Sequence, residues 1–305
     1  AAAVHAMAGK LGLPSLLGPP GPERDLACAL VISRVLRPAS KLSTISWWDD
    51  VTLGPDLGAA GASTDDVYAA MDWLVSRQDG IEKRLARRHL QDGGIAMSGL
   101  SSSWVEGSCC ELAAFGHSRD GKRGRRQIEY GLLTDPVGRP VAVEVFPGST
   151  ADPESFKTAI TRVRTDFGIE RLIMVGDRGM ITGTRIDELR KLPGMDWVTV
   201  LKAPAIAKLA ADGGPLQMSL FDTQNFAEIT HPDYPGGRLV CCHNPALEAD
   251  RARTREELLA DTEASLATIK ASVDAGRLKD PDKSGIRVGK VINKRNVAKP
   301  FILDI

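Results

Sequence analysis

Cysteine and aromatic residues are scarce in this sequence. Its 305 residues include five cysteines, and aromatic residues make up 5%. The cysteines form two adjacent pairs and a singleton: Cys28, Cys109, Cys110, Cys241 and Cys242. This arrangement makes a poor disulfide framework, and it lacks the two-residue gap between ligands that is typical of a zinc ribbon. We therefore expect reduced thiols and a cytoplasmic protein.

Long apolar runs are also missing. A membrane-spanning helix needs about 20 consecutive apolar residues, whereas LACALVISRVL (26–36) is too short and contains Arg34. No charged start followed by an apolar stretch indicates a signal peptide. We expect no contact with a membrane. The chain begins without Met and stops within the strand-like KPFILDI, so we expect both ends to be cuts rather than natural termini.

The sequence lacks a net charge and a phosphate-binding glycine motif. The formal net charge is +0, so any binding of nucleic acid must come from local patches. Glycines 176, 179 and 183 fit neither the dinucleotide-binding nor the Walker spacing. A nucleotide-dependent α/β enzyme is therefore disfavoured.

The first 92 residues are expected to form a helical region. Pro22 suits the first turn of a helix, and Leu26 and Leu30 recur at helical spacing. The segment 63–75 opens with capping residues and also has a helical apolar face. Two interpretations stay open: a small helical bundle, or a domain that binds DNA ends through outward-facing Arg84, Arg87, Arg88 and His89.

Residues 93–202 change to an α/β pattern. We expect strands near 93–105, 126–135 and 140–146, the last two joined by the turn DPVGRP (135–140). A helix from Asp152, a strand over 171–176, a helix over 184–192 and a strand over 196–201 follow. Three antiparallel strands followed by helix, strand, helix and strand are typical of the first part of an RNase H-like core. The predicted fold class is thus mixed α/β (α+β).

Residues 203–305 are expected to form an insertion subdomain. The segment is poor in strands at first, with a short strand near 236–244 and a long charged helix over 246–272. Glu256, Glu257 and Glu263 on that helix are expected to form a solvated face. The segment after 284 has strand character, and its basic part (286–299) holds five basic residues and no acid. It could form a second pair of strands that faces DNA.

One acid follows a buried-looking strand. In RLIMVGDRGMIT (171–182), Asp177 comes directly after the strand and a glycine. Asp177 could cap the next helix, pair with Arg178 or bind a metal ion. In RNase H-like enzymes, carboxylates hold two divalent ions about 4 Å apart, and magnesium prefers such oxygen ligands.

Three stretches of the chain resemble insertion-sequence transposases of the DDE class, most closely the IS-four-like branch. They are LSSSWVEG (100–107), AAFGHSRDGKRGRRQIEYGLLTDPVGRPVAVEVFPGSTADP (113–153) and RLIMVGDRGMIT (171–182). The resemblance implies a DNA transposase that cleaves and transfers strands at transposon ends with Mg²⁺ or Mn²⁺, two ions in an intact family member. It also implies double-stranded DNA as partner, a homodimer as an option, and a cytoplasmic, nucleoid-associated protein.

The resemblance implies Asp177 as the second catalytic, metal-binding acid. The chain departs from the family pattern at two places. The family's first acid directly precedes LSSSW, where this chain has Gly99, and glycine cannot ligate a metal. The family's third acid lies in a tyrosine–arginine–glutamate motif that no tyrosine of this chain begins. We therefore expect an impaired copy, or alternatively a catalytically inactive remnant that binds DNA.

A dense basic segment lies between the first two expected strands. SRDGKRGRR (118–126) contains Arg119, Lys122, Arg123, Arg125 and Arg126. Glycine permits close approach of the backbone to phosphates, and arginine makes forked contacts with them. The segment favours binding of DNA over a merely solubilising hairpin tip.

Overall fold

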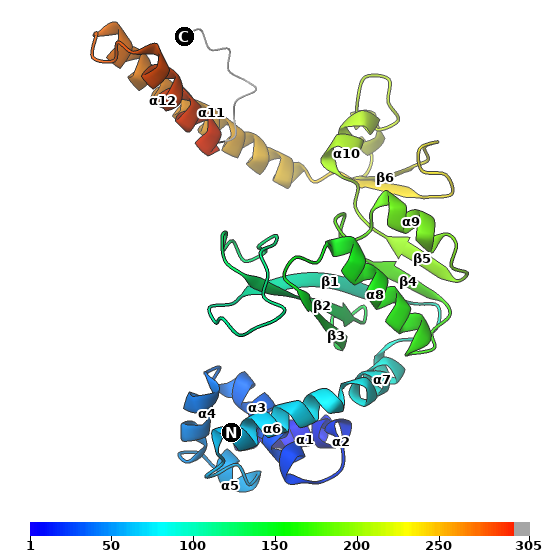
Figure 1. Cartoon of the computed structure of the whole chain (residues 1–305). Helices are drawn as coiled ribbons and strands as arrows, with labels where there is room; N and C mark the ends of the chain where they lie inside the picture. The colour runs from blue at the N-terminus through cyan, green and yellow to red at the C-terminus, as the bar shows by residue number, and fades with distance from the viewer. Residues whose placement is uncertain (296–305) are drawn as a thin grey trace. The chain divides into compact units, whose positions relative to one another are not determined.

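The computed structural model describes residues 1–295, and the chain divides into two units, Ala1–Lys202 and Ala203–Ile305. Figure 1 shows the N-terminal helices, the sheet and the later helices in order along the chain. No helix within the described residues is both long and apolar enough to cross a membrane.

The first unit begins with a helical region, as predicted. Trp48, Leu53 and Val67 are fully buried at its centre, and the indole N–H of Trp48 donates to Ser33 Oγ at 2.8 Å. Ser63 is the N-cap residue of the helix Thr64–Ser76 and forms a capping box with Asp66. The helices are α1 (Ala2–Lys10), α2 (Leu13–Leu17), α3 (Pro22–Leu36), α4 (Lys41–Trp48), α5 (Leu53–Asp56), α6 (Thr64–Ser76) and α7 (Gln78–His89).

A five-stranded mixed sheet follows, with the strand order β3-β2-β1-β4-β5. β1 is antiparallel to β2, and β2 to β3, whereas β4 and β5 run parallel to β1. This order and these directions are those of the RNase H-like fold, which confirms the predicted fold class. The strands are β1 (Gly94–Trp104), β2 (Gln127–Thr134), β3 (Pro140–Pro147), β4 (Leu172–Val175) and β5 (Met195–Val198).

Helices α8 (Asp152–Thr165) and α9 (Gly183–Leu189) follow β3 and β4. The inward side of α8 carries Phe156 and Val163, and both are fully buried in one cluster with Ala96 of β1 and Met174 of β4. Alternate residues of a strand face opposite sides of a sheet. Gly99 therefore lies on the other face of β1, with Leu132 opposite it on β2. Leu132 is 38% exposed, so this second face is partly open.

The edge of the sheet formed by β3 is covered by α7. The outward N–H of Val143 donates to Glu82 Oε1 at 3.0 Å, and its C=O accepts from Gln78 Nε2 at 2.8 Å. Unpaired strand edges invite pairing with other chains, and such contacts prevent it. Arg162 of α8 completes the junction through ion pairs with Glu82 (2.5 Å) and Glu144 (3.1 Å).

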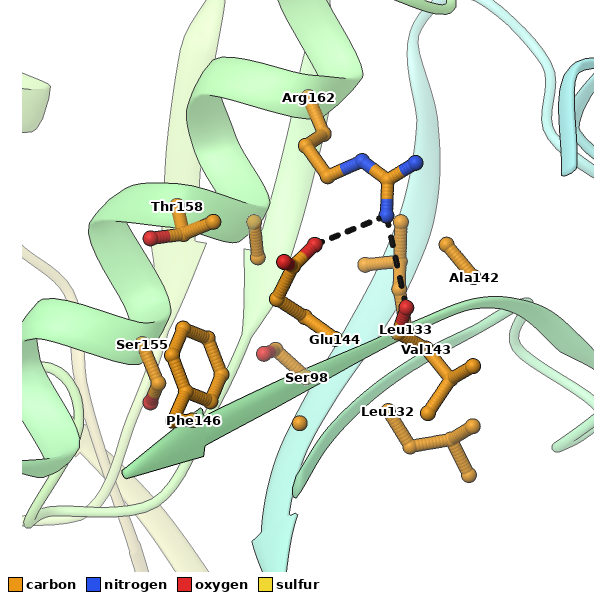
Figure 2. A pocket seen from close by; sticks show the side chains of 12 residues that line it. Ser98, Leu132, Leu133, Ala142, Val143, Glu144, Phe146, Ser155, Thr158 and Arg162 are labelled. Carbon is orange, nitrogen blue, oxygen red and sulfur yellow. Dashed lines mark hydrogen bonds and ion pairs between the residues drawn. The ribbon is translucent and has the colours of Figure 1, made fainter. Parts of the chain in front are cut away.

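Figure 2 shows the pair between Arg162 and Glu144 beside a cavity between α8 and the sheet. The cavity measures 20 Å³, which leaves room for about one water molecule. This space is part of the packing of the core rather than a pocket for a ligand.

The second unit contains a two-stranded sheet and two paired helices. β6 (Phe226–Ile229) and β7 (Leu239–Cys242) are antiparallel, after α10 (Ala203–Leu209) and a short helical turn, η1 (Met218–Phe221). The predicted long helix is α11 (Pro245–Asp274), which packs with α12 (Pro281–Arg295). Glu256, Glu257 and Glu263 are exposed, as expected.

The prediction of strands after residue 284 is wrong for the described part of that segment, which forms α12. Its β-branched residues favour strands locally, but Ile292 is buried at helical spacing from the buried Ser284. Packing against α11 therefore overrides local propensity. The remainder of the predicted strand segment, 296–305, lies outside the described residues.

Candidate functional site

Asp177 lies just beyond β4, next to the middle of β1. The parallel pairing of β1 and β4 runs from Gly94 opposite Leu172 to Met97 opposite Val175. The pairing ends there, two residues before Gly99 on β1 and two residues before Asp177 on the chain that leaves β4. The two positions that the family resemblance singles out thus both follow the paired part of β1 and β4.

The carboxylate of Asp177 also organises its own turn. Its Oδ1 accepts hydrogen bonds from the backbone N–H groups of Gly179 (2.8 Å) and Met180 (2.9 Å). Asp177 therefore caps the turn that precedes α9, whereas the N-cap residue of α9 itself is Thr182, whose side chain makes no capping hydrogen bond. Pairing with Arg178 is not among the ion pairs of the described residues.

Gly99 occupies an open place on β1. A β-carbon added there would meet no atom within 4 Å. The backbone needs no special conformation at this position, because Gly99 has ordinary strand pairing with Leu132. Neither crowding nor backbone strain therefore requires glycine at residue 99.

A second carboxylate, which the sequence analysis did not single out as a site residue, lies close to Asp177. A β-carbon added to Gly179 would lie 2.8 Å from Oδ2 of Asp152 and 3.2 Å from Oδ1 of Asp177. Both acids therefore border the space that Gly179 leaves free. Asp152 is the first residue of α8. In the sequence it served only as the marker of a helix start, and an acid at the first helical position is common because of the helix dipole.

Arg119, which the sequence analysis groups with the DNA-binding residues of the loop, instead points toward these acids. Its Nη1 lies 3.0 Å from Oε1 of Glu129, and its Nη2 pairs with Oδ1 of Asp152. The Arg119 side chain is 18% exposed. The sequence of the loop did not indicate that Arg119 faces inward, because the acids that pair with Arg119 lie outside the loop, on β2 and α8.

Glu129 is the buried member of the group. Its side chain is 1% exposed, and its Oε2 has no hydrogen-bond partner among the described residues. Burial raises the pKa of Glu129, and the hydrogen bond and charge of Arg119 only partly oppose this. The alternation of apolar residues in QIEYGLLT gave one available signal, since it places Glu129 on the same face as Leu133.

The remaining basic residues of the loop are exposed. No ion pair engages them within residues 1–295. Lys122 lies over the Trp104 ring at 5.9 Å and Arg126 over the Phe115 ring at 6.0 Å. Gly121 and Gly124 have φ values of 76° and 73°, a left-handed conformation that favours glycine. The exposed cations are Lys122, Arg123, Arg125 and Arg126.

The stem of this loop is firmly attached to the sheet. The backbone N–H of Arg119 donates to Ser102 Oγ at 3.0 Å, and Gln127 Nε2 donates to the C=O of His117 at 3.0 Å. Gln127 also donates to the C=O of Gly148 at 3.0 Å. The loop therefore presents its exposed cations from a fixed base.

The other basic candidates differ in their contacts. Arg84 donates to the C=O of Leu16 at 2.5 Å, and His89 is half-buried with its pKa lowered, chiefly by burial. Arg87 and Arg88 are exposed. Of the four, Arg84, Arg87 and Arg88 are exposed, and Arg84 is held by its hydrogen bond to Leu16.

The donor set does not fit a pair of divalent ions. Gly99 offers no side-chain ligand, and the described residues contain no group of three or more His, Cys, Asp or Glu side chains that could hold a metal ion. Asp152, the nearest further acid, is already paired with a guanidinium. A two-ion mechanism needs several converging carboxylates, and this set of side chains does not supply them.

Comparison with known proteins gives structural likeness only. No family model and no curated protein matches the chain. The similar solved structures include the Mos1 transposase paired-end complex with left transposon end, at 14% identity and a TM-score of 0.25, over 63% of this chain and 62% of that one. A pre-cleavage Mos1 transpososome matches at 13% identity and a TM-score of 0.23, over 63% of each chain.

The Mos1 mariner paired end complex with Mn matches at 15% identity and a TM-score of 0.22, over 61% of this chain and 60% of that one. This chain thus spans less than two thirds of each of these proteins. Similarity at this level carries no functional argument, and the assignment of the fold rests on the order and direction of the strands.

Proposed function

We propose that this protein is a DNA-binding member of the DDE transposase class, of the IS-four-like branch, that engages transposon ends. The observation that carries the proposal is the loop between β1 and β2, which presents four exposed cations from a base fixed on an RNase H-like sheet. A net charge of +0 leaves such local patches as the source of affinity for phosphate. A homodimer belongs to the proposal as an option.

Metal-dependent cleavage and transfer of strands is the activity that the resemblance to this class implies. In support, Asp177 follows β4, which pairs with β1 up to two residues before the position of the family's first acid. Against it, this position holds Gly99. The proposal for the chain itself is therefore binding of DNA, with the chemical steps impaired.

Binding through the loop can be tested by its salt dependence. Replacing Arg123, Arg125 and Arg126 with alanine should lower the slope of log affinity against log salt by about 0.9 for each phosphate that is no longer neutralised. The measurement is a fluorescence-anisotropy titration of duplex DNA at several salt concentrations.

A matched control removes three arginines elsewhere: Arg251, Arg253 and Arg255, all exposed on α11. This variant should keep the wild-type slope. An equal reduction of the slope in both variants would show that the loop has no special part in binding. An unchanged slope in the loop variant would show that the loop stays in solvent and does not contact DNA.

A further inference from the structure

Arg119 differs from every other cation of its loop because it bridges two carboxylates. One guanidinium nitrogen contacts Glu129 of β2 and the other contacts Asp152, the first residue of α8. These acids come from elements that are far apart in the sequence. The planar guanidinium can contact both at once, which a single ammonium group cannot do with the same geometry.

The position of this bridge is next to the candidate catalytic acid. Asp152 borders the space beside Gly179 that Asp177 also borders. Neighbouring carboxylates repel one another unless a cation compensates them. Glu129 makes the need for compensation greater, because its side chain is 1% exposed and one of its oxygens has no hydrogen-bond partner in the described part of the chain.

The same residue attaches the basic loop to the sheet. The backbone N–H of Arg119 donates to Ser102 Oγ on β1, two residues before the first of the loop's left-handed glycines, Gly121. The exposed cations all come after this attachment point. The side chain and the backbone of one residue thus connect the carboxylates to the part of the loop that faces outward.

We propose that Arg119 is the resident cation of this carboxylate cluster and the positioning residue of the DNA-binding loop. Its guanidinium provides the positive charge that compensates Glu129 and Asp152. The fold therefore does not depend on a metal ion at this point. The part of this inference that concerns DNA rests on the proposed function, whereas the part that concerns charge compensation does not.

The test compares Arg119→Met with Arg123→Met, a matched removal of one arginine from the exposed part of the same loop. Unfolding midpoints are measured with EDTA, with magnesium and with manganese. The wild type and Arg123→Met should change little between these conditions. Arg119→Met should be less stable in EDTA and should gain more from manganese than the wild type does, because an ion can then enter among the uncompensated acids.

A second variant keeps the test decisive if Arg119→Met fails to fold. The double variant Arg119→Met/Glu129→Gln removes both charges of the buried pair and leaves Asp152 facing Asp177. It should again show a larger gain from manganese than the wild type. If manganese raised the unfolding midpoint of the wild type as much as that of the variants, the proposal would be overturned. Such a result would show that the metal ion binds even when Arg119 is present.

Binding of duplex DNA by the same variants tests the positioning role. Arg123→Met should lower the salt slope by about 0.9, the value for one phosphate. Arg119→Met should weaken binding more than Arg123→Met does, because all the exposed cations then lack their fixed base. Weaker binding by Arg123→Met than by Arg119→Met would overturn the positioning role. Failure of the wild type to bind DNA would instead overturn the proposed function, while the melting experiment would still decide the charge compensation.

Discussion

At residue 99 the chain has glycine where the resemblance implies the first of the metal-binding acids. A β-carbon at this position meets no atom within 4 Å, and both Gly99 and Asp177 come two residues after the last pair of the β1–β4 register. The environment therefore accepts a larger side chain. The consequences of restoring a carboxylate here are electrostatic rather than steric.

Gly99→Asp should lower stability in the absence of divalent ions and increase the stabilisation that magnesium or manganese gives. The two carboxylates repel each other, and a cation that binds only the folded state between them stabilises that state. Unfolding midpoints of the variant and the wild type, with EDTA and with each ion, measure both effects.

Gly107→Asp is a suitable control, because Gly107 is also exposed with no atom within 4 Å of an added β-carbon. It introduces the same charge after β1 ends. If Gly99→Asp gains no more from metal ions than this control, residues 99 and 177 do not form a common site.

At the scale of the element, the loop between β1 and β2 depends on close approach of two backbone segments. A β-carbon on Gly116 would lie 1.8 Å from the carbonyl oxygen of Gly148. A single isolated bridge between Ala114 and Gln127 lies next to this contact. The segment around residue 116 therefore attaches the loop to the end of β3 as well as to β2.

Gly116→Ala should displace this segment and lower the free energy of unfolding by about 1–3 kcal/mol, a cost typical of overpacking. We expect weaker binding of DNA as well, because the exposed cations follow the displaced segment. Gly107→Ala changes the same loop at a place with free space and should leave both properties close to wild type. Equal effects of the two substitutions, measured by urea denaturation and anisotropy, would contradict this account of the loop.

The order of elements in the core could be predicted from the sequence because each strand is bounded by strong signals. The turn at 135–140 and the alternation on either side of it specify a hairpin, which β2 and β3 form. By contrast, α12 could not be predicted from local propensity, because contacts with α11 decide its structure. The inward direction of Arg119 was hidden for the same reason: Glu129 and Asp152 are distant in sequence.

The position of Asp177 could be predicted from the sequence only in part. Its position after a buried strand was visible in the sequence, and the resemblance to a transposase family gave it a role. The strand register then showed that β4, which Asp177 follows, pairs with β1. Its closeness to Asp152 required the packing of α8 against the sheet, which no pattern within either segment indicates.

At the scale of the whole molecule, the proposed DNA-binding loop contrasts with the small number of acidic side chains that could hold metal ions. The loop exposes four cations. The described residues nevertheless contain no cluster of three or more side chains suited to hold a metal ion. Binding and cleavage should therefore separate in this chain.

We expect the purified chain to bind duplex DNA without nicking or joining it in magnesium or manganese. The physical reason is that Asp177 alone cannot hold two ions in the geometry that an in-line displacement at phosphorus requires. The measurement is conversion of a supercoiled plasmid that carries the transposon ends into nicked or joined products, with Asp177→Asn assayed in parallel. Nicking by the wild type that Asp177→Asn abolishes would contradict this prediction and show that another carboxylate, with Asp152 the first to examine, completes the site. If the wild type and Asp177→Asn both nicked the plasmid, the activity would not depend on Asp177. This result would also contradict the assignment of Asp177 as the centre of the site.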